Sequence, residues 1–192
     1  MNAERLWLHY NFLPATKPTS GSRPALPPYV LLSEMLETCR SLAEVEATLA
    51  RGERTAGMML FAVDGKDESF AVYERDRATY RQRQAENGWL AGTNNPAGAT
   101  AGEGDAYVTA SRRRYERLAQ LLPRAKASGQ AGDVSGAFVR PLADPEVEGR
   151  GTGSGTVYAN VACPSAGVLW YTFGGYPAAS RGNWQRVAWP WQ

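Results

Sequence analysis

Hydrophobic residues in the first fifty positions follow the periods of one strand and two helices. Leu6–Leu13 is apolar at nearly every position, which predicts a buried strand. Apolar residues recur at helical spacing over Val30–Cys39, so a helix is expected after the proline-rich stretch Pro14–Pro28. Ser41 and Glu44 have the spacing of a capping box, in which each side chain accepts from a free backbone N–H. A second short helix is therefore expected to begin there.

Strand-like runs fill the middle of the chain. Gly57–Val63 and Ser69–Glu74 flank a turn that begins with Asp-Gly, which is a strong hairpin signal. Polar residues alternate over Thr79–Gln84, a pattern typical of a strand at the exposed side of a sheet. A further short strand is predicted over Gly88–Gly92, and it would deliver Thr93–Pro96 to the end of the sheet.

The second half of the chain predicts helices followed by a hairpin. A helix is expected over Arg112–Leu122, with Ser111 at its start and Pro123 at its stop. A weaker helical pattern covers Asp133–Leu142. Three further segments predict strands: Thr156–Ala162, Val168–Phe173 and Trp184–Trp191. This order of strand, helices, meander, helix and hairpin indicates an α+β fold rather than alternating βαβ units.

The composition is that of an ordinary folded domain. The 192 residues include 43% hydrophobic and 21% charged side chains and carry a net charge of +2, so a single domain over residues 1–192 is expected. No apolar run approaches the ~20 residues that span a bilayer, and no membrane association is expected. The arginines are not interleaved with exposed aromatic motifs, so no nucleic-acid partner is expected either.

Two cysteines and one histidine limit the chemistry that the chain supports. Two distant cysteines do not form a disulfide framework, which favours a reducing cytoplasm. With one histidine and no Cys-x-x-Cys pair, neither a metal nor another cofactor is expected. Taken singly, His9, Cys39 and Cys163 are explained as structural residues. The run Gly149–Gly155 lacks the Gly-Lys-Ser/Thr ending of a phosphate loop and is explained as a turn.

Charged side chains gather at two places along the chain. Asp64, Asp67 and Glu68 crowd the predicted hairpin tip, where solvation explains them. Arg112–Arg114 stand at the start of a predicted helix, where positive charge opposes the helix dipole. Either an anionic group offsets these arginines, or they form a solvated basic face, which is the simpler explanation.

Thr93–Pro96 differs in kind from these features. Asn94 follows a flexible glycine and precedes a proline at the end of a predicted strand, so its amide N–H can point into a pocket. A neutral donor of this kind can stabilise the oxyanion of a tetrahedral intermediate. An Asx-turn at a strand end is the alternative explanation.

The order of several short motifs is more informative than any one of them. In chain order they are Leu36–Val45, Val63–Gly65, Ala71–Glu74, Gly92–Asn94, Ser111–Leu118, Thr156–Tyr158 and Leu169–Trp170. This succession, which covers about Leu8 to Trp189, resembles the acyltransferases and amidases related to isopenicillin-N acyltransferase, within the choloylglycine hydrolase and penicillin V acylase group. The resemblance implies the N-terminal nucleophile (Ntn) hydrolase fold, a four-layer αββα sandwich.

The resemblance assigns roles to a few matching positions. It implies that Asn94, from the Thr-Asn pair, is a donor in the oxyanion hole. It also implies that Arg114 helps to orient the nucleophile, a role that Arg112 or Arg113 takes if the alignment shifts slightly. Glu74, which matches a strand end of the family, is expected to be structural.

The resemblance further implies a nucleophile that this chain does not contain. In the family, a cysteine exposed at a chain N-terminus by self-cleavage lies upstream of the strand matched by Leu6–Leu13. The fold is therefore expected to be incomplete at its N-terminus, since Cys39 and Cys163 lie at the wrong positions to replace this cysteine. The expected function is hydrolysis or acyl transfer on a small-molecule amide or acyl substrate, with the cysteine supplied by an upstream segment.

Two alternatives stand beside this expectation. One is a catalytically inactive fragment or binding module, in which self-association masks apolar surface that the missing strands leave uncovered. The other is an unrelated α+β domain in which the motif matches arise by chance.

Overall fold

The computed structural model describes residues 1–13, 26–51, 57–75, 79–85, 87–97, 106–128, 134–151 and 155–190. The chain divides into two compact units, the first comprising Met1–Gly104 with Trp191–Gln192 and the second comprising Asp105–Pro190. Each unit contains helices and one antiparallel sheet, so the α+β class is confirmed. The single domain over residues 1–192 stays a prediction, and most of the predicted loop Pro14–Pro28 lies outside the described residues.

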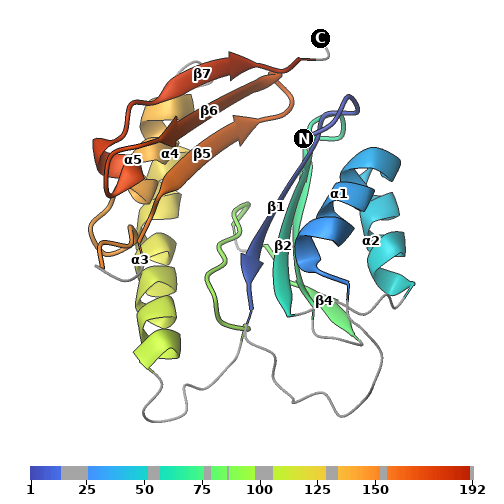
Figure 1. Ribbon diagram of the computed structural model, residues 1–192, viewed down its shortest axis with the longest axis horizontal. Helices are drawn as coiled ribbons and strands as arrows, with labels where there is room; N and C mark the ends of the chain where they lie inside the picture. The colour runs from blue at the N-terminus through green and yellow to red at the C-terminus, as the bar shows by residue number, and fades with distance from the viewer. Residues whose placement is uncertain are drawn as a thin grey trace. The chain divides into compact units, whose positions relative to one another are not determined.

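The first unit is built on an antiparallel sheet with the strand order β1-β2-β3-β4 (Figure 1). Its strands are β1 (Leu6–Phe12), β2 (Met58–Asp64), β3 (Ser69–Arg75) and β4 (Tyr80–Gln82). The predicted hairpin between β2 and β3 is confirmed, because Met58 lies opposite Arg75 and Asp64 lies opposite Ser69. The strand order places β1 at one edge of the sheet.

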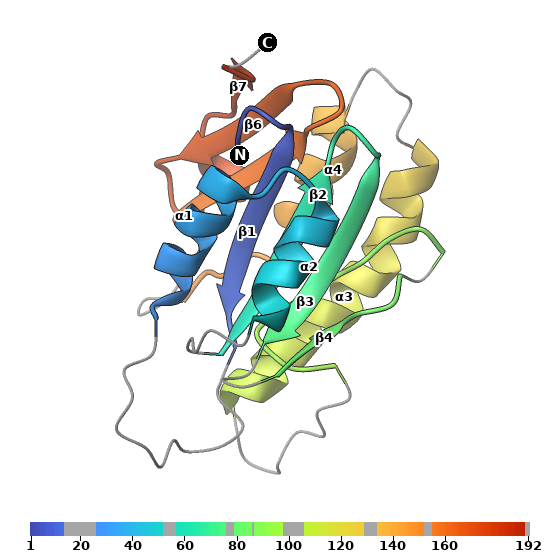
Figure 2. The same cartoon turned by 90° about the vertical axis from the view of Figure 1, so that its right-hand side faces the viewer.

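Two helices, α1 (Pro28–Thr38) and α2 (Leu42–Ala50), cover one face of this sheet (Figures 1 and 2). Successive side chains of a strand point to opposite faces, so alternate positions of each strand face the helices. The resulting core consists of buried apolar residues from both layers: Leu6, Leu8, Leu31, Met35, Cys39, Val45, Leu49, Met58, Leu60, Ala62, Ala71 and Tyr73. Cys39 is thus a core residue, as predicted.

The junction between α1 and α2 is capped by the predicted pair of residues. Ser41 Oγ accepts from the Glu44 backbone N–H at 3.3 Å. The Glu44 carboxylate acts one residue further out than expected, since its Oε2 accepts from the backbone N–H of Arg40 at 2.5 Å. Both contacts satisfy backbone donors next to a helix start, where intrahelical acceptors are missing.

The opposite face of the first sheet carries a smaller apolar cluster. Leu13, Met59 and Val72 are buried in it, with Phe61 and Leu90 packed against them. In Figure 1 the green segment that follows β4 runs along this face, away from α1 and α2. The chain after β4 therefore covers part of the sheet that the helices leave open.

β1 is less buried than its apolar sequence predicts. Phe12 is 55% exposed, because β1 is an edge strand. The His9 ring stacks on Trp7 with their centroids 5.7 Å apart, and His9 Nε2 forms a hydrogen bond with Asn11 Oδ1 at 3.2 Å. Burial lowers the pKa of His9 below its ordinary value, and the Asn11 contact opposes this shift. Packing accounts for His9, as predicted.

The second unit combines three helices and three strands within the described residues. Its elements are α3 (Ala106–Ser128), α4 (Val134–Leu142), β5 (Tyr158–Cys163), β6 (Val168–Phe173), α5 (Ala178–Arg181) and β7 (Gln185–Ala188). The strands form an antiparallel sheet in the order β5-β6-β7. Arg117 of α3 donates to Asp144, just after α4, with Nη2 to Oδ2 at 2.7 Å, and this pair lowers the pKa of Asp144.

α3 is longer at both ends than predicted. It begins five residues before Ser111, and it continues past Pro123 to Ser128. A proline removes one helical hydrogen bond, but Pro123 is exposed, so water can satisfy the carbonyl that loses its partner. Ala125 is buried beyond the proline, which favours continuation of the helix. No helix in the described part of the chain is long and apolar enough to cross a bilayer.

The two faces of the second sheet differ in cover. Thr172 faces α5, since its Oγ1 donates to Ala178 O at 3.3 Å, and its partner Ala159 is buried on the same face. Tyr158, Tyr171 and Phe173 alternate with these residues and are exposed on the other face. The second sheet thus has one face towards the helices and one open aromatic face.

The cap at Ser41 predicts a measurable contribution to stability. Replacing Ser41 with Ala removes the acceptor of the Glu44 N–H and is expected to lower the free energy of unfolding by about 1 kcal/mol. Ser33→Ala is the matched control, because Ser33 is exposed within α1 and alanine favours a helix interior. Urea unfolding followed by circular dichroism compares the two, and equal effects would contradict a capping role.

The burial of His9 predicts a pH dependence of definite sign. A folded pKa below the ordinary 6.5 means that the unfolded chain binds the proton more readily. The contribution of His9 to stability is therefore fully present above this value and is lost as the pH falls towards the folded pKa. Because the chain has one histidine, an NMR titration reads its pKa directly, and the expected midpoint lies below 6.5. A midpoint at or above 6.5 would show that desolvation does not dominate.

Candidate functional site

The sequence predicts that Asn94 follows the end of a strand, but the structure shows no such strand. Residues 88–92 form no strand beyond an isolated bridge at Trp89. A Cβ at Gly92 would lie 2.2 Å from Met59 Sδ and 2.6 Å from Phe61 Cζ, so the backbone packs directly on top of β2. The apolar residues of this segment therefore cover the sheet face instead of extending the sheet.

The loop Ala91–Ala97, called the Asn94 loop below, is held by a buried carboxylate. Glu74, near the end of β3, is 5% exposed. Its Oε1 accepts from Arg83 Nε at 2.5 Å and from the Ala97 backbone N–H at 2.7 Å. A carboxylate removed from water needs such donors. Glu74 thereby ties the end of the Asn94 loop to the sheet.

Arg83 connects the same carboxylate to two more points of the loop. Its Nη1 donates to Ala91 O at 2.9 Å, and its Nη2 donates to Asn95 O at 2.8 Å. Arg83 is itself 9% exposed, and its backbone N–H donates to Val72 O at 2.8 Å. One planar guanidinium thus joins Glu74 to the loop on both sides of Asn94.

Arg81 supplies an outer contact to the same group. It lies directly opposite Glu74 in the pairing of β3 with β4, and its Nε donates to Glu74 Oε2 at 2.7 Å. Its Nη2 also donates to Ala97 O. The Arg81 side chain is more than half exposed, so water screens its attraction to Glu74 more than that of Arg83.

The side chain of Asn94 is oriented by the end of β1. Asn94 Nδ2 donates to Phe12 O at 2.8 Å. Because a carbonyl oxygen accepts only from the nitrogen of an amide, this contact distinguishes the two ends of the side chain. Beside it, Thr93 Oγ1 donates to Asn95 Oδ1 at 2.7 Å. The amide of Asn94 is thus held in a defined orientation by Phe12 O, and oriented neutral N–H donors are the kind of group that forms an oxyanion hole.

Arg112–Arg114 do not lie at a helix start. α3 begins at Ala106, so these arginines lie more than one turn inside the helix and the expected conflict with the helix dipole does not arise. Arg112 pairs with Glu116 at 3.5 Å on the exposed side of α3, and Arg114 is half-buried. Asn94 belongs to the first unit and these arginines belong to the second, so their joint action stays a prediction.

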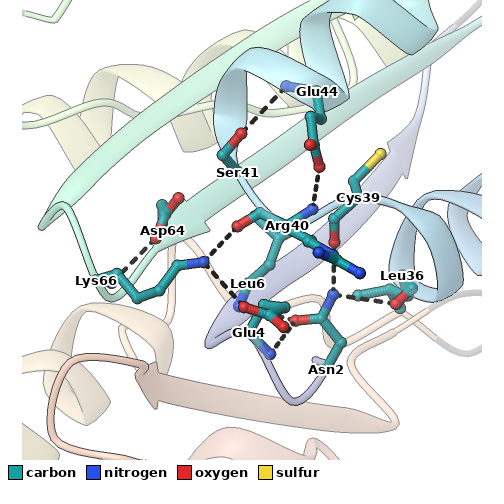
Figure 3. Close-up of polar contacts among 10 residues, drawn as sticks. All are labelled: Asn2, Glu4, Leu6, Leu36, Cys39, Arg40, Ser41, Glu44, Asp64 and Lys66. Atoms are coloured by element: carbon teal, nitrogen blue, oxygen red, sulfur yellow. Dashed lines mark hydrogen bonds and ion pairs between the residues drawn. The ribbon is translucent and has the colours of Figure 1, made fainter.

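Cys39 lies at the other end of β1 from Asn94. Asn2 marks that end, since its Nδ2 donates to Cys39 O at 2.9 Å and its Oδ1 accepts from the Leu6 N–H at 3.1 Å (Figure 3). Asn94 contacts Phe12, and at ~3.3 Å per residue the two ends of β1 are about 20 Å apart. Cys39 is also buried in the helix-covered core. It therefore cannot attack a carbonyl group held by Asn94.

The polar contacts around Lys66 join three segments of the first unit. Lys66 Nζ, in the turn between β2 and β3, donates to Glu4 Oε2 at 3.1 Å and to Arg40 O at 2.7 Å (Figure 3). Asn2 Nδ2 also donates to Leu36 O at 3.0 Å, near the end of α1. These contacts hold the N-terminal segment, the helix junction and the turn together, and they have a structural role.

Asp64 corrects the prediction of a solvated hairpin tip. Its side chain is fully buried, although Asp67 and Glu68 are exposed as expected. Its Oδ1 accepts from the Lys66 backbone N–H at 3.0 Å, which closes an Asx-type turn. Oδ2 has no hydrogen-bond partner among the described residues. Along β2, Asp64 has the same parity as Met58, Leu60 and Ala62, so its side chain lies on the helix-covered face of the sheet and is kept from water.

The remaining candidates in the second unit behave as structural residues. Cys163 ends β5, with its Sγ 3.8 Å from Ser165 Oγ. The two ends of the glycine-rich run pair with each other, since Arg150 forms a bridge with Gly155 and the Gly149 N–H donates to Thr156 Oγ1 at 3.0 Å, while residues 152–154 lie outside the described part of the chain. Nowhere in the described ranges do three or more His, Cys, Asp or Glu side chains form a group that could hold a metal ion.

The residues that hold the Asn94 loop were not identified from the sequence. Glu74 was expected to be structural only, and Arg81 and Arg83 were assigned to the exposed side of a strand. The two-residue spacing of Arg81 and Arg83 predicts that they share one face of a strand. Their pairing with Glu74 could be predicted only from the register of β3 with β4, which places Glu74 opposite Arg81.

Comparison with known proteins does not assign a family to this chain, so the functional interpretation depends on the geometry of the Asn94 loop. The chain matches no protein-family model and no curated protein. The resemblance to Ntn hydrolases stays a hypothesis based on the order of short motifs, and the oriented amide of Asn94 is the structural feature that bears on it.

Proposed function

We propose that this chain contributes the oxyanion donor to an Ntn-type amide hydrolase or acyltransferase. The proposal rests on the amide of Asn94, whose Nδ2 is oriented by Phe12 O and whose loop is anchored on a buried ion pair. A preorganised donor lowers a barrier because it does not have to reorient as charge develops on the substrate oxygen. The order of motifs along the chain supports the same reaction class.

The reaction would be acyl transfer from a small-molecule amide or thioester to water or an amine. A cysteine thiolate attacks the carbonyl carbon, the carbonyl oxygen becomes an oxyanion, and an N–H of Asn94 donates to it. Collapse of this intermediate expels the amine or thiol, and water or another amine then releases the acyl group. Asn94 donates without a change in its own protonation, and Arg114, or alternatively Arg112 or Arg113, helps to position the thiolate.

The cysteine of this reaction would come from a segment upstream of the chain. Cys39 is separated from Asn94 by the length of β1 and is buried under α1 and α2. An oxyanion donor accelerates a reaction only when the nucleophile is held about 3 Å from the substrate carbon. The proposed segment would join the sheet beside β1, which lies at its edge.

An αββα sandwich is the fold that we propose for the assembled enzyme. Each unit provides helices and one sheet. The face of the first sheet away from α1 and α2 carries Met59, Phe61 and Val72, which the chain after β4 partly covers, and the open face of the second sheet carries Tyr171 and Phe173. Packing of one sheet on another covers such faces at a spacing of about 10 Å. Both cysteines are free thiols, which supports a cytoplasmic location.

A second candidate function is that of a non-catalytic binding module. The observation that favours it is the exposed aromatic face of the second sheet, where Phe173 is 74% exposed. Contiguous exposed apolar surface is typical of an interaction site. In this case the occupant of the face is a second copy of the chain.

The proposed function predicts that the purified chain alone is inert. No hydrolysis of fluorogenic amides, esters or thioesters is expected, because the nucleophile is missing. If the purified chain hydrolyses a substrate and Asn94→Ala abolishes this activity, the claim that the nucleophile lies outside the chain is wrong.

The positive arm of this experiment adds the polypeptide encoded directly upstream of Met1. Activity is expected in the combined protein, and Asn94→Ala is expected to lower kcat by roughly 10²–10³-fold. Asn183→Ala, which replaces an exposed asparagine of the second unit, is the matched control and should leave kcat unchanged. Equal rates for the two variants would refute the assignment of Asn94.

The binding-module candidate predicts self-association through the second sheet. Analytical ultracentrifugation of the chain should then show a dimer, and Phe173→Asp should convert it to a monomer because a charge cannot be buried unpaired. Tyr29→Asp is the control, since Tyr29 is equally aromatic and exposed but lies in α1. A monomeric wild-type chain would rule out this candidate.

A further inference from the structure

We infer that Glu74 and Arg83 are the positioning residues of the Asn94 loop, and that they set the direction in which the Asn94 amide donates. This inference rests on the proposed role of Asn94 as oxyanion donor. It is carried by the contacts of Glu74 and Arg83, which reach the loop on both sides of Asn94.

The first step is the coverage of the loop by two side chains. Arg83 bonds to the carbonyls of Ala91 and Asn95, while Glu74 accepts from the backbone N–H of Ala97. Three backbone points within seven residues are therefore fixed relative to β3 and β4. Asn94 lies between them and has little freedom to turn away from Phe12.

The second step is the geometry that only arginine offers at position 83. Its Nε donates to Glu74 at 2.5 Å, and its two terminal nitrogens donate to different carbonyls of the loop. These three donors lie in one rigid plane, so moving any one of them moves the others. A lysine keeps the charge at this position but presents a single ammonium group, and it cannot make the three contacts in the same directions.

The third step distinguishes positioning from stabilisation. A buried ion pair is a poor way to gain stability, because desolvation of both charges offsets much of their attraction. It is an effective way to impose direction, because each charged group demands correctly placed partners. The Glu74–Arg83 pair is buried and bonded to loop backbone on both partners, whereas the Arg81–Glu74 pair is open to water on the arginine side.

The experiment observes the side-chain NH₂ of Asn94 by NMR in the ¹⁵N-labelled chain. Loss of its signals in Asn94→Ala assigns them. In Arg83→Lys and Glu74→Gln, exchange of these hydrogens with water is expected to become about tenfold faster or more, while amides in α1, α2 and β2 keep their protection. Ser41→Ala is the matched control, because it removes a cap at the helix junction and should leave the Asn94 signals unchanged.

A second measurement keeps the inference testable if the variants fail to fold. In the wild-type chain, the Ala97 backbone N–H donates to Glu74 and should be protected from exchange to the same degree as amides of β3. Rapid exchange at Ala97 would overturn the inference. Unchanged Asn94 signals in folded Arg83→Lys and Glu74→Gln would overturn it as well.

A kinetic readout separates this inference from the proposed function. In the combined protein with its upstream segment, Glu74→Gln and Arg83→Lys should lower kcat and kcat/KM by the same factor, because the lost interaction is made in the transition state. If Asn94→Ala leaves kcat unchanged while the NMR results hold, the proposed function fails and the positioning stands. If Asn94→Ala abolishes activity but the Asn94 signals are unchanged in Glu74→Gln and Arg83→Lys, the positioning role of these two residues is wrong and the proposed function stands.

Discussion

A carboxylate that leaves water must find donors, and in the first unit this requirement decides where the Asn94 loop lies. Glu74 takes its donors from Arg81 in β4, from Arg83 just after β4 and from the backbone of Ala97. Arg83, buried beside it, needs acceptors in turn and takes them from Ala91 and Asn95. The loop conformation is thus a consequence of satisfying two buried charges, and the orientation of Asn94 follows from the loop.

A second constraint concerns the face of each sheet that the helices do not cover, because apolar side chains on that face also have to be shielded from water. In the first unit the segment after β4 covers part of that side, with Leu90 packed on Met59 and Val72. In the second unit the corresponding face stays aromatic and exposed, with Tyr158, Tyr171 and Phe173. The proposed sandwich and the proposed dimer are two solutions to the same problem, because each one covers these residues.

The sequence predicted those helices and strands in which the spacing of apolar residues alone determines which side chains are buried. The helical spacing in α1, the cap at Ser41 and the paired runs of β2 and β3 all depend on near neighbours, and they are found as expected. The failures depend on distant residues. The run 88–92 is apolar because it lies on Met59 and Phe61, and Asp64 is buried because it lies on the helix-covered face of β2. The role of Asn94 stays a prediction, and the register of β3 with β4 that brings Glu74 to its loop was not available from local pattern.

Gly92 has a consequence for how this protein can change over evolutionary time. The space above β2 at this position holds a hydrogen and no carbon, because Met59 and Phe61 fill it. A larger residue at 92 requires the side chains at positions 59 and 61 to move aside or to become smaller in the same lineage. Substitutions at these three positions should therefore be correlated among descendants of this sequence, whereas no such contact constrains the exposed Ala97 side chain at the end of the loop.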